Sequence, residues 1–303
     1  MNLSRAITEP LVGLIAFHNQ FNRNIKFSFG AIAQLQTQAR DRPEGPISLP
    51  TGGEPWAAMS WNDIDVMATS AETFIAEMGI VRAASAFEDY MTGALAEFDR
   101  AMGNPETVEA DTSVSRFIKR LGCNPSSLER QLVMWDFFDE ARNCIVHRSG
   151  RANAELARLA SSEKLRQTVT SWPKRTGKWK VALPDVLLGE VVRWQPRHAI
   201  MASDAYYRLA TALDRHLIAA LDERGVVRMA AHWCLFAENT VQGRGKLNVQ
   251  VRLRALLADR YCVIADSQEE VIAALRDVGI WENVRKEFDK RFPETTRAGR
   301  KRA

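Results

Sequence analysis

The sequence predicts a predominantly α-helical protein, a helical bundle with a small β-hairpin and a C-terminal helical appendage. Three observations predict it. Apolar residues recur at helical spacing along most of the 303 residues, the stretch 61–102 contains no proline, and glycine and proline cluster between the helical segments. With 46% hydrophobic and 26% charged residues, the composition is that of a globular protein, so a sizeable core is expected.

The longest helical pattern covers residues 61–102. Its apolar residues keep helical spacing throughout, which indicates either one very long helix or two stacked helices broken near Gly79. A loop rich in proline and glycine, residues 42–55, separates this pattern from an N-terminal helical segment. The Gly-Asn-Pro sequence at 103–105 ends it.

Two further helices are expected before the middle of the chain. A short one covers about 113–121 and ends at the glycine that follows. A longer one begins at a capping box formed by Ser126 and Glu129, in which the side chain of each residue accepts a hydrogen bond from the backbone N–H of the other. It ends at about Arg148, because Gly150 can adopt the left-handed conformation that terminates helices.

The rest of the chain is expected to hold the hairpin and four more helices. The hairpin strands are residues 178–183 and 190–194. The helices are expected at about 199–223, 248–259, 268–277 and 280–291. The predicted organisation is an N-terminal helical segment with its loop (1–55), a main helical domain (56–225), a C-terminal helical appendage (226–296) and a basic disordered tail (297–303).

Charge and cysteine content argue against several classes of function. The formal net charge is +4, too small to demand a nucleic-acid partner by itself. The four cysteines lie far apart without a Cys-x-x-Cys pair, which argues against a zinc ribbon or a redox dithiol. No apolar run approaches the roughly 18 residues of a membrane span, and the N-terminus lacks a secretory pattern. We therefore expect a cytoplasmic protein that does not span a membrane.

Residues 141–150, Ala-Arg-Asn-Cys-Ile-Val-His-Arg-Ser-Gly, carry the groups best suited to chemistry. Arg142 and His147 together supply what metal-free RNA cleavage needs: a fixed cation for the phosphate, and an imidazole that moves a proton near neutral pH. Asn143 lies on the same helix face as His147, in a polar stripe that acidic residues extend by helical steps. Arg142 and His147, however, lie about 140° apart around an ideal helix.

The same spacing of arginine and histidine occurs a second time, at Arg193 and His198. Spacing alone is therefore weak, because on the order of one or two such matches are expected by chance in a chain of this composition. In the second match Pro196 would interrupt a helix that carried both residues. We interpret His198 as structural, together with the other histidines outside the first match.

The string Arg142-Asn143-x-x-x-His147-x-x-Gly150, after an aromatic-rich helix, resembles the signature of HEPN domains. These are compact helical modules of many prokaryotic ribonuclease toxins and antiviral effectors. The segment 80–90, in which Glu88 and an aromatic residue follow an apolar run, resembles the helix that precedes the signature in several of those families. A looser match in helix order covers about residues 60–223, and the residues beyond 225 are not covered.

The resemblance implies a metal-independent RNA endonuclease, a toxin or phage-defence effector that leaves 2′,3′-cyclic phosphate and 5′-hydroxyl ends. His147 would be the general base or acid, Arg142 would hold the scissile phosphate, and Asn143 would orient one of them. Glu88 is a further catalytic candidate. The resemblance also implies a homodimer in which two motifs face one cleft, no cofactor or metal, and an antitoxin or other defence protein as a candidate partner.

The candidate RNA-binding residues are Arg148, Lys174, Arg175, Lys178 and Trp179. Downstream of the motif, cations alternate with the indoles of Trp172 and Trp179, and this mixture suits unpaired RNA, whose bases stack on rings and whose backbone attracts cations. A loop can equally be basic without contacting RNA.

Several alternatives stay open. The chain could be a non-catalytic HEPN-like module that binds RNA or a protein, or a DNA-binding regulator that uses its C-terminal helices. His147 could be a helix-end residue favoured by the helix dipole, and Arg142 could pair with Asp139 one turn back. Glu88 could be structural, and Cys144 a packed thiol.

Overall fold

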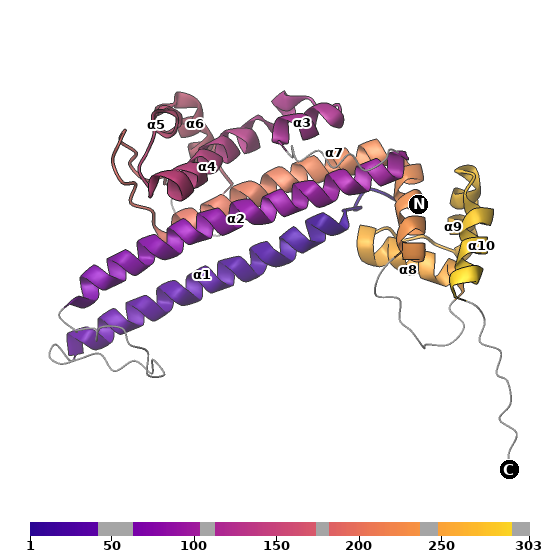
Figure 1. Ribbon diagram of the computed structural model, residues 1–303, viewed down its shortest axis with the longest axis horizontal. Coiled ribbons are helices and arrows are strands. Elements are labelled where there is room, and N and C mark those ends of the chain that lie inside the picture. The colour runs from indigo at the N-terminus through magenta and orange to yellow at the C-terminus, as the bar shows by residue number, and fades with distance from the viewer. Residues whose placement is uncertain (42–62, 104–112, 174–181, 237–247, 293–303) are drawn as a thin grey trace, which may run out of the picture. The chain divides into compact units, whose positions relative to one another are not determined.

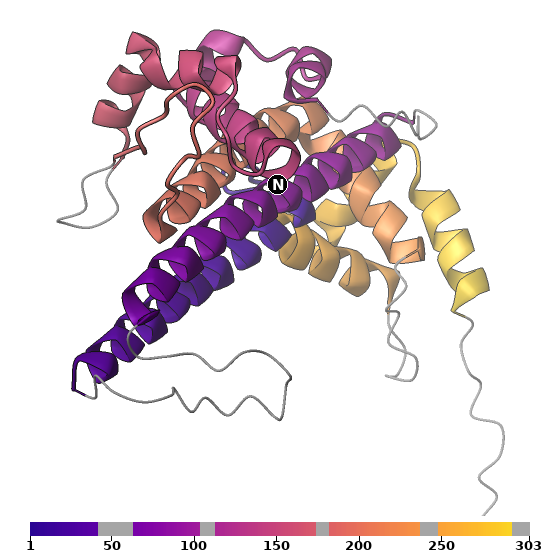
Figure 2. The same cartoon turned by 60° about the vertical axis from the view of Figure 1, so that its left-hand side comes forward.

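The computed structural model describes residues 1–41, 63–103, 113–173, 182–236 and 248–292. The predicted all-α class is confirmed for these residues (Figures 1 and 2). The elements are α1 (Glu9–Asp41), α2 (Ile64–Met102), α3 (Val114–Arg120), the short 3-10 helix η2 (Pro125–Leu128), α4 (Glu129–Arg148), α5 (Ala154–Ser161), α6 (Glu163–Ser171), α7 (Pro196–Phe236), α8 (Val249–Tyr261), α9 (Gln268–Asp277) and α10 (Trp281–Arg291). No described helix is long and apolar enough to cross a membrane.

The predicted β-hairpin does not form in the part of the chain that the structure describes, where no residue belongs to a strand. Within the predicted second strand, Val191 makes only an isolated antiparallel bridge with Arg151. The backbone of residues 189–192 hydrogen-bonds to residues 150–152, which follow α4, and this long-range pairing replaces a local hairpin. Residues 178–181 of the predicted first strand lie outside the described residues.

The chain divides into two compact units. The motif unit consists of Leu14–Asp89 and Asn124–Ala210, and the terminal unit consists of Met1–Gly13, Tyr90–Cys123 and Thr211–Ala303. Each unit is therefore assembled from segments that are distant in sequence. The boundaries drawn from the sequence near residues 55, 225 and 296 stay a prediction.

In the motif unit, α1 and α2 lie side by side, and α7 packs against the same part of α2 (Figures 1 and 2). Gly79 is the point of closest approach. A Cβ atom built on Gly79 would lie 2.7 Å from the Ala199 Cβ and 3.2 Å from the Phe21 ring. The structure therefore selects the single long helix, and Gly79 permits close packing rather than a break.

Helix α4 buries its apolar side in the motif unit. Its buried side chains include Met134, Phe137, Phe138 and Ile145. The apolar spacing in the sequence predicts an inward face of Leu128, Leu132, Trp135, Phe138 and Ile145. Of these, Leu128, Phe138 and Ile145 are buried, whereas Leu132 and Trp135 are only half-buried. The buried face of α4 is therefore shifted by about one residue relative to the predicted apolar face.

Both ends of α4 depend on local turn chemistry. The predicted capping box is wrong, because α4 follows the η2 turn, and Leu128 at its N-cap makes no side-chain cap hydrogen bond. Instead Asn124 caps η2, accepting from the Ser126 N–H at 3.0 Å. At the C-terminus the backbone turns left-handed at Ser149 (φ 53°) and again at Gly150 (φ 76°), as the glycine predicted.

Two short helices, α5 and α6, follow α4 and were not expected from the sequence. Each begins at a side-chain cap: Asn153 accepts from the Leu156 N–H at 2.8 Å, and Ser162 accepts from the Leu165 N–H at 3.2 Å. Each helix buries few residues, namely Leu156 in α5, and Leu165 with Thr168 in α6. They pack on α4, where Figure 1 shows them adjacent to it.

The terminal unit contains α3, α8, α9, α10 and parts of the longer helices. The predicted bounds of α8, α9 and α10 agree with the observed ones to within two residues. The helix expected to end at about 223 is interrupted there: Asp222 has φ 53° and ψ −169° inside α7. Its Oδ1 accepts from the N–H groups of Arg224 and Gly225, which starts the following helical segment.

Candidate functional site

The last two turns of α4 carry the three residues of the motif: Arg142, Asn143 and His147. The Arg142 side chain is 28% exposed, and His147 is exposed. The sequence places them there because the opposite side of α4 is apolar and buried, which turns the polar stripe outward.

Arg142 is held by two side chains. Its Nη2 donates to Glu88 Oε1 at 3.0 Å, and its Nη1 donates to Asn143 Oδ1 at 3.1 Å. Glu88 lies on α2, 54 residues away in sequence. The ion partner of Arg142 is therefore Glu88 rather than the neighbouring Asp139, so both candidates Glu88 and Asn143 contact the guanidinium.

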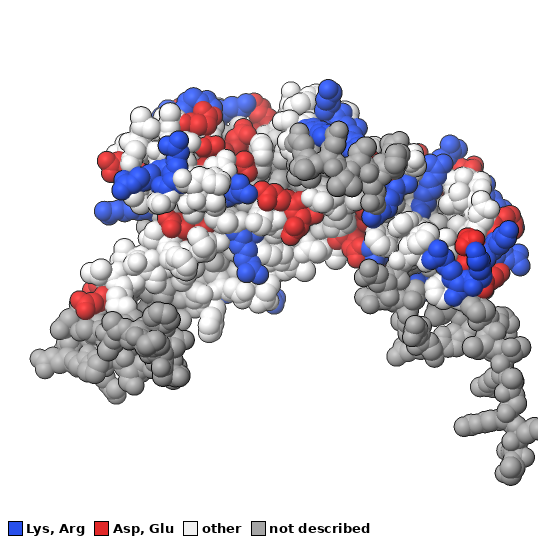
Figure 3. Space-filling view, viewed as in Figure 1, with Lys and Arg blue, Asp and Glu red and all other residues white. Residues whose placement is uncertain are grey.

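Carboxyl groups surround this arginine. Burial raises the pKa of Asp139 to about 6, the charge of Arg142 opposes this rise, and Glu88 adds to it. Glu140 accepts from Asn153 Nδ2 at 2.5 Å. Acidic and basic side chains accordingly lie close together over α4 to α6 (Figure 3). The positive charge of Arg142 is thus largely balanced within the chain.

The side chain of His147 makes no hydrogen bond or ion pair with the residues that the structure describes, and the same holds for the side chain of its neighbour Arg148, which is also exposed. No contact joins the side chains of His147 and Arg142 there either. Their five-residue separation places them about 140° apart around α4. Within one chain the structure therefore leaves the imidazole accessible but does not bring it to the guanidinium.

The second arginine–histidine match is structural, as expected. His198 is 1% exposed at the start of α7, where its Nδ1 accepts from the Gln195 N–H at 3.0 Å. Burial, with Arg197 as a second cause, lowers the pKa of His198 to about 4. A buried neutral imidazole in a helix-start turn has no access to a substrate.

Of the candidate RNA contacts, Lys174, Arg175, Lys178 and Trp179 lie outside the described residues. Trp172 is 4% exposed, and its indole N–H donates to Asp204 Oδ2 at 2.9 Å. The same carboxylate oxygen accepts from Arg208 Nε at 2.7 Å. Trp172 is therefore part of the core and not available for stacking on a base.

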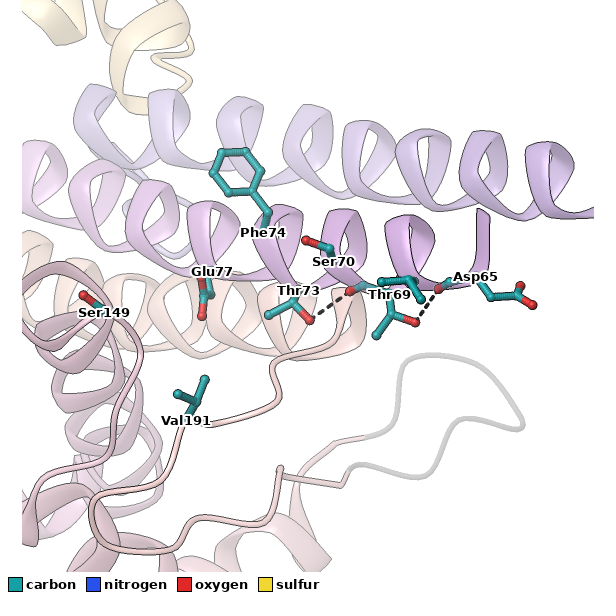
Figure 4. Close-up of a pocket in the computed structure, with 9 residues that line it drawn as sticks. Asp65, Thr69, Ser70, Thr73, Phe74, Glu77, Ser149 and Val191 are labelled. Atoms are coloured by element: carbon teal, nitrogen blue, oxygen red, sulfur yellow. Dashed lines mark hydrogen bonds between the residues drawn. The ribbon is translucent and has the colours of Figure 1, made fainter. Parts of the chain in front are cut away.

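An open groove of about 800 Å³ runs along the N-terminal half of α2 (Figure 4). Sequence reasoning missed it, although the spacing of Asp65, Thr69, Thr73 and Glu77 by four residues could have revealed a polar stripe. Ser149, at the end of α4, and Val191 complete the lining with Val66, Ser70 and Phe74. Burial raises the pKa of Glu77, whose Oε1 lies close to the backbone at Gly150, since a Cβ atom built there would be 2.8 Å from it.

No group of three or more histidine, cysteine, aspartate or glutamate side chains is placed to hold a metal ion among the described residues. Comparison with family models, with curated proteins and with solved structures gave no match to this chain.

Proposed function

We propose that the chain is a cytoplasmic, metal-independent RNA endonuclease of the HEPN type, acting as a toxin or phage-defence effector. The observation that carries the proposal is the placement of the motif at the end of α4. There Arg142 is fixed by Glu88 and Asn143, while His147 is exposed. A fixed cation and an accessible imidazole are the two groups that this chemistry requires.

In the proposed reaction, His147 takes the proton of a ribose 2′-hydroxyl. The 2′-oxygen attacks the adjacent phosphorus, the bond from phosphorus to the 5′-oxygen breaks, and the leaving oxygen takes a proton from a general acid. Arg142 binds the non-bridging oxygens as negative charge builds on them. The products are a 2′,3′-cyclic phosphate and a 5′-hydroxyl, so DNA is not a substrate.

A second copy of the chain completes the proposed site. The reaction needs a base and an acid, whereas one motif offers a single histidine. Arg142 and His147 also point to different sides of α4. When the α4 ends of two copies face one cleft, His147 of one copy and Arg142 of the other can contact the same phosphate. Arg148 and the basic residues 174–178 then contact the flanking RNA.

A second candidate is a non-catalytic HEPN-like module that binds RNA or a protein such as an antitoxin. The ion pair between Arg142 and Glu88 favours it, because an arginine neutralised inside its own chain is also what a structural role requires. The two candidates differ in a simple assay. Growth arrest on overexpression that Arg142→Ala relieves supports catalysis, whereas binding without arrest supports the module.

The direct test is to incubate the purified protein with tRNA or mRNA in the presence of EDTA. We expect cleavage by the wild type and its loss in His147→Ala. The matched control is Val146→Ala, which truncates an exposed neighbour on α4 and is expected to keep the activity. Cleavage that disappears with the chelator, or that persists in His147→Ala, contradicts the proposal.

A further inference from the structure

A series of hydrogen bonds connects the start of α5 to α2 through the Arg142 guanidinium. At its outer end Asn153 Nδ2 donates to Glu140 Oε1 at 2.5 Å. The other Glu140 oxygen accepts from Asn143 Nδ2 at 3.4 Å, and Asn143 Oδ1 accepts from Arg142 Nη1 at 3.1 Å. Arg142 Nη2 completes the series by donating to Glu88 Oε1 at 3.0 Å.

This series of hydrogen bonds fixes the orientation of the Asn143 amide. An amide has one accepting end and one donating end, whereas an ionised carboxylate only accepts. Glu140 therefore holds the nitrogen of Asn143 and leaves its oxygen facing Arg142. The reversed amide would place two donors against each other, with the guanidinium pushed away. The position of Arg142 thus depends on Glu140, which does not touch it through a hydrogen bond.

Asn153 links Glu140 to the start of α5. Its Oδ1 caps α5 by accepting from the Leu156 N–H at 2.8 Å. The remaining end of the Asn153 amide is therefore aimed at Glu140. Among the described residues Glu140 makes no ion pair, so the two amides are its hydrogen-bond partners there.

We propose that Glu140 and Asn153 are positioning residues for Arg142, a role that rests on the proposed nuclease function. They hold Asn143, and through it the guanidinium, in one orientation. Two of the five guanidinium N–H groups are used by Asn143 and Glu88, and one hydrogen on each Nη is left for phosphate oxygens. Because a displacement of one ångström can cost about 100-fold in rate, a small shift of Arg142 matters.

The test is Asn153→Ser, which keeps a good helix cap but removes the donor to Glu140. We expect an unchanged melting temperature, a fall of about tenfold or more in kcat with little change in KM, and a rise in the pKa of Asp139. Arg142 lowers this pKa, whereas the carboxyls of Glu88 and Glu140 raise it, so a guanidinium that moves away should raise the pKa that NMR measures on the Asp139 carboxyl resonance. Asn248→Ser, at the cap of α8, is the control.

The two readouts separate this inference from the function on which it rests. A wild type that cleaves no RNA contradicts the proposed function, and the Asp139 titration still decides whether Asn153 positions Arg142. Unchanged cleavage and an unchanged Asp139 pKa in Asn153→Ser overturn the inference. Loss of cleavage without a rise in that pKa also overturns it, because Arg142 has then not moved.

Discussion

Replacing Glu97 by glutamine should stabilise the protein at neutral pH. Glu97 lies in the terminal unit with 2% of its surface exposed. Burial raises its pKa from 4.5 to about 8, the Asp214 carboxyl adds to the rise, and Arg100 opposes it. The folded protein therefore keeps this carboxyl protonated at a pH where the unfolded chain ionises it. Glutamine has the same shape and no proton to lose.

The size of the effect follows from the difference between the two pKa values. One pH unit corresponds to about 1.36 kcal/mol, so holding Glu97 protonated at pH 7 costs about 3 kcal/mol. A carboxyl with a raised folded-state pKa contributes its full stability below about pH 4.5, and that contribution is lost as the pH rises towards about 8. Glu97→Gln should gain about 3 kcal/mol at pH 7 and under about 1 kcal/mol at pH 5.

Urea unfolding followed by circular dichroism at pH 5, 6, 7 and 8 measures this difference. The free energy of unfolding of the wild type should fall over this range, and that of Glu97→Gln should fall less. The exposed Glu282, in the same unit, provides the control, because Glu282→Gln should leave the pH dependence as it is. Parallel curves for the wild type and Glu97→Gln would refute the reasoning.

Two other predictions concern packing and RNA binding. Gly79→Ala should lower the free energy of unfolding by about 1–2 kcal/mol, because its Cβ would lie 2.7 Å from that of Ala199. The control is Gly30→Ala, whose Cβ would have nothing within 4 Å and which should raise the free energy of unfolding by up to about 1 kcal/mol. Equal urea midpoints for the two variants would contradict the packing described for α2. Alanine at the basic and aromatic residues of 174–179 should weaken binding of single-stranded RNA. Because three cations are lost, the slope of the logarithm of the binding constant against the logarithm of the salt concentration should become shallower by about 2. Unchanged affinity in a filter-binding titration would remove that segment from the RNA interface.

Helices with continuous apolar spacing could be predicted from the sequence. This is true of α2 and of α9, whose predicted bounds, 268–277, are the observed ones. Helices α5 and α6 were missed because each has fewer than ten residues and buries only one or two side chains. The hairpin does not form in the described residues, because the backbone partners of residues 189–192 come from residues 150–152, which no local pattern indicates.

The candidate site was predictable only in part. The motif placed Arg142, Asn143 and His147 at the end of one helix, and the structure has them there. The ion pair between Arg142 and Glu88 joins two helices, and no local sequence pattern indicates it because the two residues are 54 positions apart. The anchor at Asn153 depends on the start of α5, so it could not be expected once that helix was missed.

The most direct measurement of the central claim is mass spectrometry of the RNA ends produced in EDTA. We expect 2′,3′-cyclic phosphate and 5′-hydroxyl ends from the wild type, none from His147→Ala or Arg142→Ala, and no cutting where the nucleotide 5′ to the cleaved bond lacks its 2′-hydroxyl. Ends of the opposite polarity, or cutting at a 2′-deoxy position, would contradict it.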